Sequence, residues 1–302
     1  MTGYMHPGYA DSLSEFGDPK ELPRCGGWLL ERQIPGVADQ DAMGCYPLFA
    51  CRDWSRLHLD LEDIGNGIVS LSLVTDPFGD YDTSYLHQCF EDVVIPFKEH
   101  FIIDLERPAD TFVCSHHRRN VAQALASVEV ERIQKPTEFL DDWVALYAAL
   151  IERHDIDGIL AFSRSAFNEQ LRVPGIAAFR AMAEGETVSM LLWYVQGDVG
   201  YYHLGASSAL GYNLCASFAL FWTAIERFAS SGLKWLDLGA GAGIGSEASD
   251  GLSRFKRGWC TDTRTAYFCG RIFDRARYAE IVRRKGISPS SYFPAYRKGE
   301  FG

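Results

Sequence analysis

The chain has 302 residues, of which 47% are hydrophobic and 23% charged, a composition typical of a globular protein of one or two domains. Its formal net charge of −11 at pH 7 argues against indiscriminate nucleic-acid binding but leaves room for a local basic site. The eight cysteines form no Cys-x-x-Cys pair, which predicts reduced thiols and no metal site. We expect a cytoplasmic protein, because no apolar run is long enough to span a membrane and the N-terminus is polar and rich in proline.

The first half of the chain reads as strands and helices after an irregular start. Residues 25–55 are rich in glycine, proline and tryptophan, which predicts irregular structure. Apolar spacing then predicts strands at 57–61, 68–74, 101–105 and 128–133. Helices are expected at 82–94 and 115–126, the second with Ser115 as its N-cap.

The second half gives a clearer pattern. A helix is expected from Pro136, with apolar residues at helical spacing as far as Ile151. Short turns containing glycine separate three predicted strands at 176–183, 186–195 and 199–204, which indicates antiparallel hairpins. A loop at 205–213, a helix at 214–230 and strands at 233–238 and 264–268 follow. The expected fold is α/β (α+β) with mixed sheets, and the candidate domain boundary lies at residues 135/136.

The most conspicuous motif is a glycine-rich run at residues 236–245, Leu-Asp-Leu-Gly-Ala-Gly-Ala-Gly-Ile-Gly. Such a run after a strand is typical of a nucleotide-binding loop and suggests a methyltransferase that uses S-adenosylmethionine. A doubly wound nucleotide domain needs helical crossovers, whereas tight turns join the three strands before this run. Too few residues follow to complete such a domain. The methyltransferase is therefore an alternative, which predicts S-adenosylmethionine binding at residues 239–245.

Four further segments occur in a characteristic order. They are residues 118–124 (Arg-Arg-Asn-Val-Ala-Gln-Ala), 201–207 (Tyr-Tyr-His-Leu-Gly-Ala-Ser), 232–239 (Gly-Leu-Lys-Trp-Leu-Asp-Leu-Gly) and 251–259 (Gly-Leu-Ser-Arg-Phe-Lys-Arg-Gly-Trp). Together with the strand order, they resemble the FemAB-like branch of the GNAT acyltransferase superfamily. The resemblance implies two GNAT-like halves, at 1–135 and 136–302, each a central mixed sheet flanked by helices.

The resemblance implies an N-acyltransferase that joins an activated acyl donor, preferably acyl-CoA, to an amine acceptor bound between the two halves. The acceptor would be a small molecule or an amine linked to a sugar or peptide. Aminoacyl-tRNA is an alternative donor, because several FemAB-like proteins use it, although the acidic charge does not favour tRNA. A non-catalytic binding module is a third alternative, since residues 208–213 match the usual GNAT loop only at Gly211.

The resemblance places the donor at the loop before the helix at 214–230, where backbone amides and the helix dipole suit a pyrophosphate. The residues expected there are Ser207, Ser208, Gly211, Tyr212 and Asn213.

Lys256 is the first catalytic candidate, because a cation in its motif would stabilise an oxyanion or grip a phosphate. His203 is expected to take the amine's proton, Tyr202 to act as an acid or anchor, and Asp237 to orient the amine. The sequence shows no convincing Cys–His or Ser–His pair, and amide formation from a thioester or ester requires no covalent nucleophile.

Four residues are candidates for holding the acceptor. Arg118 and Arg119, at the start of a predicted helix, would bind a phosphate or carboxylate, for which the arginine fork is well suited. Phe255 and Trp259, which flank Lys256 in its motif, would line the acceptor site.

Overall fold

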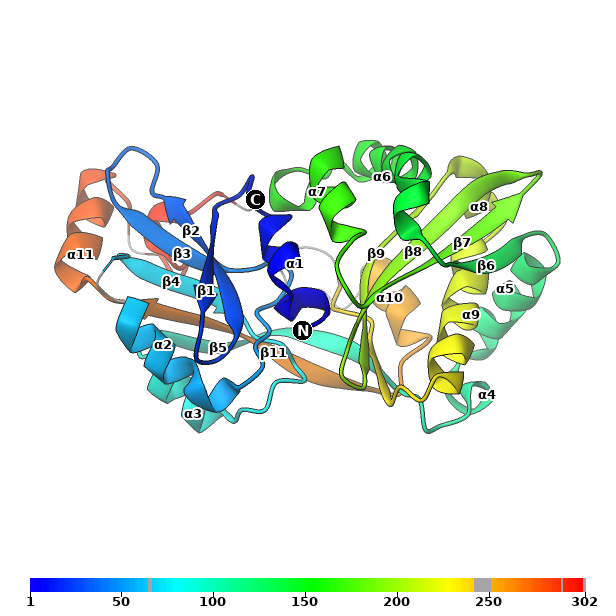
Figure 1. The fold of residues 1–302 in the computed structure, drawn as a ribbon, viewed down its shortest axis with the longest axis horizontal. Coiled ribbons are helices and arrows are strands. Elements are labelled where there is room, and N and C mark those ends of the chain that lie inside the picture. The colour runs from blue at the N-terminus through cyan, green and yellow to red at the C-terminus, as the bar shows by residue number, and fades with distance from the viewer. Residues whose placement is uncertain (65–66, 242–250, 289, 301–302) are drawn as a thin grey trace. The chain divides into compact units, whose positions relative to one another are not determined.

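The structure is a computed structural model that describes residues 1–64, 67–241, 251–288 and 290–300 (Figure 1). The chain forms two compact units. The central unit contains residues 1–3 and 98–264, and the terminal unit contains residues 4–97 and 265–302. The boundaries between the units fall inside two long strands, β5 (Val93–Asp104) and β11 (Asp262–Ile272). The units therefore do not coincide with the predicted halves at 1–135 and 136–302.

The terminal unit is built on a mixed sheet. Its strands follow the order β1 (Asp18–Leu22), β2 (Gly27–Gln33), β3 (Gln40–Gly44), β4 (Ser70–Val74) and β11. Neighbouring strands are antiparallel except β3 and β4, which are parallel. Its helices are α1 (Pro7–Asp11), α2 (Leu57–Ile64), α3 (Thr83–Cys89) and α11 (Arg275–Arg284).

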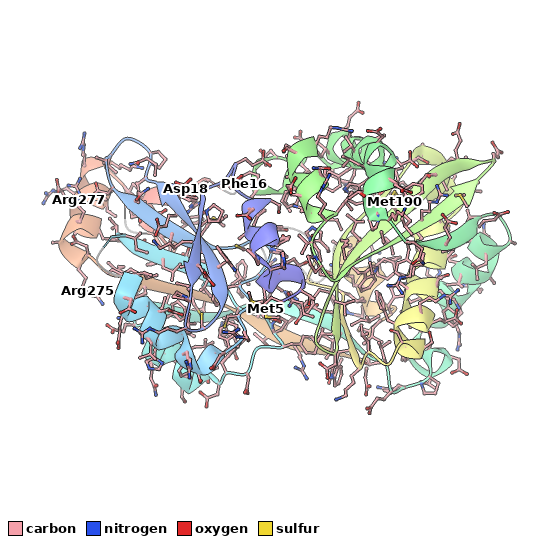
Figure 2. The ribbon with its side chains drawn as sticks, viewed as in Figure 1. Met5, Phe16, Asp18, Met190, Arg275 and Arg277 are labelled. Atoms are coloured by element: carbon pink, nitrogen blue, oxygen red, sulfur yellow. The ribbon has the colours of Figure 1, made fainter. Side chains whose placement is uncertain are left out.

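Ion pairs attach the last part of the chain to this unit. Buried Asp41 accepts two hydrogen bonds from the guanidinium of Arg297, which is itself buried. On α11, Arg277 pairs with Asp39 and Arg275 pairs with Asp92; Figure 2 labels both arginines. A buried charge is tolerated only when it is paired and hydrogen-bonded, so the loss of either partner of the Asp41–Arg297 pair would destabilise the folded protein.

Several predictions for the terminal unit need correction. Residues 57–61 begin helix α2 and do not form a strand; Leu57, Asp60 and Leu61 are buried at helical spacing, which a short alternating run imitates. Residues 25–55 contain β2 and β3 and are therefore not irregular throughout. The helix expected at 82–94 is α3, which ends at Cys89. The strand expected at 68–74 is confirmed as β4.

The central unit contains a larger mixed sheet in the order β5, β10 (Trp235–Asp237), β9 (Val199–Ser207), β8 (Glu186–Gln196), β7 (Ile176–Ala183) and β6 (Glu129–Ile133). Strands β6 to β9 are joined in antiparallel register, which confirms the predicted hairpins. Strand β10 is parallel to β9 and antiparallel to β5. The strand before the glycine-rich run therefore lies in a mixed sheet, unlike the parallel sheet that the methyltransferase alternative requires. Residues 242–250 of that region lie outside the described residues.

Helices cover both faces of this sheet. They are α4 (Ala109–Phe112), α5 (Ser115–Leu125), α6 (Leu140–His154), α7 (Arg164–Gln170), α8 (Ala209–Asn213), α9 (Ala216–Ser230) and α10 (Gly251–Arg257). The two units together also contain short 3₁₀ turns, at Gly3–Met5, Trp54–Arg56, Pro136–Phe139, Gly158–Leu160 and Ala295–Arg297.

Successive side chains of a strand point to opposite faces, so β8 identifies the two layers. Trp193 packs against Phe221 and Phe228 of α9. The next residue, Tyr194, donates its hydroxyl to the carbonyl oxygen of Gln170 in α7. We call these sides of the sheet the α9 face and the α7 face. Figure 1 shows α9 and α5 side by side, and α6 near α7.

Candidate active site

The parallel strands β9 and β10 part after a short pairing. Their register joins Trp235 to Val199, Leu236 to Gly200 and Asp237 to Tyr201, after which β10 ends and β9 continues to Ser207. Gly239 then takes a φ of 71°, a left-handed conformation that favours glycine. We call the region around the ends of this pairing the strand-parting site, because side chains of both strands border it.

A β-bulge in β9 adjoins the strand-parting site. Trp193 pairs with Tyr202 and Leu192 pairs with Leu204, so His203 is an extra residue opposite β8. Bulges redirect side chains and are common beside active sites. This one places Tyr202 on the α9 face, against Trp193 and Phe221, with His203 on the α7 face against Tyr194.

Lys256 brings a buried cation to the strand-parting site. Its side chain is 5% exposed, and Nζ donates a 2.6 Å hydrogen bond to the carbonyl oxygen of Ala240. Nζ also lies 5.5 Å from the ring centroid of Tyr202. Two of the predicted catalytic residues are therefore brought together. Burial raises the pKa of the Tyr202 hydroxyl, so this group can donate a hydrogen bond but is not a base at neutral pH.

Asp237 lies on the other face of the strand-parting site and contacts a residue that the sequence did not identify. Its carboxylate is 2% exposed and accepts the Gly239 N–H at 2.7 Å. His100 of β5 lies with Nδ1 at 2.8 and 3.0 Å from the two carboxylate oxygens. No local motif marks His100, because its partner is 137 residues away in sequence. The sequence signal for a role of His100 was its position just before the predicted strand at 101–105.

His203 has a different environment from the one predicted. Its ring packs 4.9 Å from Tyr194 and 6.2 Å from Phe162, and Nε2 lies 3.2 Å from the side-chain oxygen of Gln170. Burial lowers the pKa of His203 to about 3, so the ring stays neutral and is a weak base. This environment disfavours the role of proton acceptor and favours a packing role on the α7 face.

The predicted donor loop is more helical than expected. Ser207 ends β9 and its hydroxyl lies 2.7 Å from that of Ser189. Ser208 is the N-cap of α8: its hydroxyl oxygen accepts the Gly211 N–H at 3.1 Å, and its own N–H donates to the carbonyl oxygen of Val188 at 2.9 Å. These two amides already have acceptors within the protein, so neither is open to a phosphate.

The last residues of this loop differ in exposure. Gly211 is buried, and an added Cβ would lie 2.2 Å from the carbonyl oxygen of Val188, so the close approach of α8 to β8 requires glycine. Tyr212 is 45% exposed and lies beneath the guanidinium of Arg153, 3.8 Å from its ring centroid. Asn213 is exposed at the end of α8.

The start of α5 holds the two predicted acceptor arginines on the surface. Arg118 donates to the carbonyl oxygen of Asp110 at 2.6 Å, and Arg119 is exposed. The N-cap of α5 is Cys114 and not Ser115 as predicted, and it makes no side-chain capping bond. The structure does not connect either arginine with Lys256 or Asp237 through a described contact.

A cysteine–histidine contact, which the sequence analysis did not recognise, lies at the same helix start. The Cys114 sulfur lies 3.2 Å from Nδ1 of His117, and Nε2 of His117 lies 2.8 Å from the carbonyl oxygen of Phe255. A carbonyl oxygen only accepts, so Nε2 carries the proton and Nδ1 faces the thiol as an acceptor. Gly258 permits this packing, because a Cβ there would lie 2.3 Å from the His117 ring.

Phe255 and Trp259 contribute to the core of the central unit. Phe255 packs 5.1 Å from Phe218 and 5.0 Å from Phe221, and Trp259 is fully buried and stacked 5.7 Å from Phe221. A fully buried ring does not reach a substrate without repacking. Together these rings hold α10 against α9 and so position Lys256.

The described part of the chain contains neither a cluster of metal-binding side chains nor a membrane-spanning helix. There, no three His, Cys, Asp or Glu side chains are grouped as a metal ion would require. None of the helices within the described ranges is long and apolar enough to cross a membrane.

Comparisons with known proteins agree with this architecture. The family described as Acetyltransferase (GNAT) domain matches residues 115–257. Curated proteins gave no match. A crystal structure of FemX is 15% identical, with a TM-score of 0.69, and the alignment covers 91% of this chain and 93% of FemX.

Two further structures are similar over nearly the whole chain. The C-terminal domain of a putative lysylphosphatidylglycerol synthetase from Agrobacterium fabrum is 12% identical (TM-score 0.60; coverage 92% of this chain and 90% of that one). L-PGS from Bacillus licheniformis is 14% identical (TM-score 0.60; coverage 93% and 96%). At these identities the likeness establishes the fold, and together with the family match it supports acyltransferase activity. Residues 115–257 therefore match the GNAT acetyltransferase domain, and the chain resembles the FemAB-like branch of the GNAT superfamily, as its motifs predicted.

Proposed function

We propose that this protein is an N-acyltransferase whose reaction takes place at the strand-parting site. The observation that carries the proposal is the pairing of a buried cation with this site: Lys256 Nζ is anchored to the Ala240 carbonyl oxygen beside Tyr202. Acyl transfer to an amine produces an oxyanion at the carbonyl under attack. A fixed cation in a site with little water stabilises such a charge more than bulk solvent does.

Each residue of the site has its own proposed role in orienting groups or in stabilising charge. An ammonium group has three N–H donors, so Lys256 can be held by Ala240 and also direct a donor toward the oxyanion. The phenol of Tyr202 can donate a further hydrogen bond, to the carbonyl or to the leaving group. Asp237 fixes the turn at Gly239, which keeps the Ala240 carbonyl in place for Lys256.

Acyl-CoA is the first donor that we propose. The GNAT resemblance places the phosphates of the cofactor between β9 and α9. The residues there are Ser207 at the end of β9 and Ser208, Gly211, Tyr212 and Asn213 at and in α8. Exposed Tyr212 and Asn213 offer a hydroxyl and an amide to such a ligand.

Aminoacyl-tRNA is the second candidate donor, and one feature of the loop supports it. The amides of Ser208 and Gly211 already donate to Val188 and to the Ser208 hydroxyl, which removes part of a phosphate cradle. An aminoacyl ester supplies the same activated carbonyl without needing a pyrophosphate there.

For the acceptor we propose an amine on a small molecule, a sugar or a peptide. Because one similar structure is that of a putative lysylphosphatidylglycerol synthetase, a lipid-linked acceptor belongs in the same panel.

A donor panel tests this function directly. The purified chain is incubated with acetyl-CoA, longer acyl-CoAs or aminoacyl-tRNA, each with a mixture of amines, and new amides are detected by mass spectrometry. We expect one donor class to give amide products and to raise the melting temperature. Stabilisation by S-adenosylmethionine alone would instead support the methyltransferase alternative.

The same panel separates an enzyme from a binding module. Lys256→Met should lower turnover by about 100- to 1,000-fold while donor binding persists, because it removes the charge and keeps most of the side-chain length. If a donor binds wild type tightly but no amide forms with any acceptor, the chain is a binding module and the proposal is wrong.

A further inference from the structure

His100 and Asp237 form a buried acid–imidazole pair in the central unit. His100 is 8% exposed and Asp237 is 2% exposed, and Nδ1 of His100 approaches both carboxylate oxygens. A carboxylate only accepts, so the proton of the neutral ring lies on Nδ1 and the lone pair on Nε2. Asp237 is itself held by the Gly239 N–H, which fixes the orientation of the whole pair.

The pair is connected to the same short segment that anchors Lys256. Strand β5 holds this segment from one side, through Leu238 N–H to the Phe101 carbonyl oxygen at 2.8 Å and Phe101 N–H to the Gly239 carbonyl oxygen at 3.1 Å. The Asp237 carboxylate contacts Gly239, and Lys256 contacts the next residue, Ala240. The carboxylate that holds His100 and the ammonium group of Lys256 thus contact adjacent residues at the strand-parting site.

The two groups reach this segment from opposite faces of the sheet. Register and alternation place Leu236 with Gly200 on the α9 face, the face of Tyr202 and Lys256. Asp237 follows Leu236 and pairs with Ile102, so Asp237 and His100 lie on the α7 face. A donor carbonyl between the separating strands would have the cation on one side and the imidazole on the other.

We propose that His100 is the catalytic residue that removes the proton from the acceptor amine, and that Asp237 is its positioning residue. This inference rests on the proposed acyl transfer. Nε2 of His100 takes the amine proton as the amine nitrogen bonds to the carbonyl carbon, and the oxyanion faces Lys256. The oxyanion then collapses, the bond to the leaving sulfur or oxygen breaks, and the proton passes from His100 to the leaving group.

The other buried histidines of the unit are less suited to this task. His203 has its Nε2 at the Gln170 side chain and is packed between Tyr194 and Phe162. His117 has a partner at each ring nitrogen, namely Cys114 and the Phe255 carbonyl oxygen. His100 combines a carboxylate that fixes its tautomer with a place at the strand-parting site.

The competing account is that His100 and Asp237 serve only to tie β5 to β10. Such a tie would affect the melting temperature and leave turnover alone once the protein is folded. A base would affect kcat with little change in the KM of the donor. Removal of the imidazole ring and its return as a free molecule separates these accounts. Exogenous imidazole can accept a proton, but it cannot tie β5 to β10 because it is not attached to β5.

The test compares His100→Gly, Asp237→Asn and the exposed control His87→Gln in the full chain, with the donor and acceptor that give amide with wild type. We expect His100→Gly to lower kcat at least 100-fold, in line with the contribution of a general base, and free imidazole to restore at least a tenth of the wild-type rate. Asp237→Asn should lower kcat at least tenfold without rescue by imidazole, and His87→Gln should match wild type.

Two outcomes overturn the inference, and they are distinguishable. If wild type forms amide and folded His100→Gly keeps kcat within threefold, His100 is not the base although the proposed function stands. If wild type forms no amide with any donor and acceptor, the proposed function fails and the inference falls with it. Should His100→Gly not fold, His100→Gln, which can still hydrogen-bond Asp237, replaces it: a kcat within threefold of wild type overturns the role of base, and a 100-fold loss supports it.

Discussion

The Nζ of Lys256 donates a 2.6 Å hydrogen bond to the carbonyl oxygen of Ala240, so α10 is tied to the segment that follows β10. This contact joins the predicted motif at 251–259 to the glycine-rich run at 236–245. It also places a buried cation where the parallel strands separate. Because one N–H of the ammonium is used to hold its position, the cation is already oriented before a substrate arrives. Preorganisation of this kind is how enzymes stabilise developing charge.

Replacement of Lys256 by methionine should lower kcat/KM for acyl transfer by about 100- to 1,000-fold, as for the loss of one oxyanion donor. Loss of the Ala240 hydrogen bond should cost only about 1–2 kcal/mol of stability, so the variant should fold. Steady-state kinetics and thermal unfolding measure the two effects. Arg254→Gln, an exposed cation on the same helix, is the matched control and should retain wild-type activity. Equal losses in both variants would contradict a specific role for Lys256.

A methyl group at Gly211 should displace α8 from β8. An alanine Cβ would lie 2.2 Å from the Val188 carbonyl oxygen, so the backbone must shift, and we expect a loss of about 1–3 kcal/mol. Affinity for the donor should fall as well, because the shift moves the loop that we propose as its site. Gly251→Ala is the control, since a Cβ there meets no atom within 4 Å. Chemical unfolding and donor titration follow both variants, and an unchanged Gly211→Ala would refute the tight packing.

Cys114 should be the first thiol to react with iodoacetamide at neutral pH. It is exposed and lies beside the acceptor nitrogen of His117, whereas burial raises the pKa of Cys45 and of Cys269 to about 12. Peptide mapping by mass spectrometry after brief alkylation identifies the modified residue. His117→Phe should slow the reaction at least several-fold by removing the base. Faster labelling of partly buried Cys215 or Cys260 would show that the contact has no influence on reactivity.

The buried ring of His203 should make stability depend on pH. Burial lowers its pKa to about 3, whereas a histidine in an unfolded chain titrates near about 6.5. Between these values the unfolded state binds a proton that the folded state does not, so stability falls as pH is lowered. From pH 7 to pH 5, wild type should lose about 1–2 kcal/mol more than His203→Gln in urea unfolding. The exposed control His87→Gln should behave like wild type, and a larger loss in His203→Gln would reverse the assignment.

The sequence was most informative where local signals define the structure. Strands β7 to β9 follow from short turns at Gly185 and Gly197, which adopt positive φ as such turns require. The apolar stripe of α9 and the fold class were equally readable. These features depend on residues that are close in sequence, and the structure confirms them.

Features that depend on distant residues were not predictable in the same way. The run at 57–61 alternates like a strand, but its burial against α3 and the sheet selects a helix. The compact units cut through β5 and β11, since strand pairing over long separations decides which residues pack together.

The candidate site was likewise predictable only in part. Motif resemblance drew attention to Lys256, Tyr202 and Asp237, which do border the strand-parting site. It missed His100, because nothing in its neighbourhood indicates a partner on β10. The contact of Cys114 with His117 was within reach of sequence reasoning, since residues three apart at a helix start lie on one side.

A structure with a non-reactive donor tests the central claim most directly. The ligand would be a ketone analogue of acyl-CoA, or of an aminoacyl-adenosine if the CoA analogue does not bind. We predict that its carbonyl lies between β9 and β10 beyond the Asp237–Tyr201 pair, with the oxygen within hydrogen-bond distance of Lys256 Nζ. A carbonyl bound elsewhere in the protein, with Lys256 still remote from it, would contradict acyl transfer at the strand-parting site.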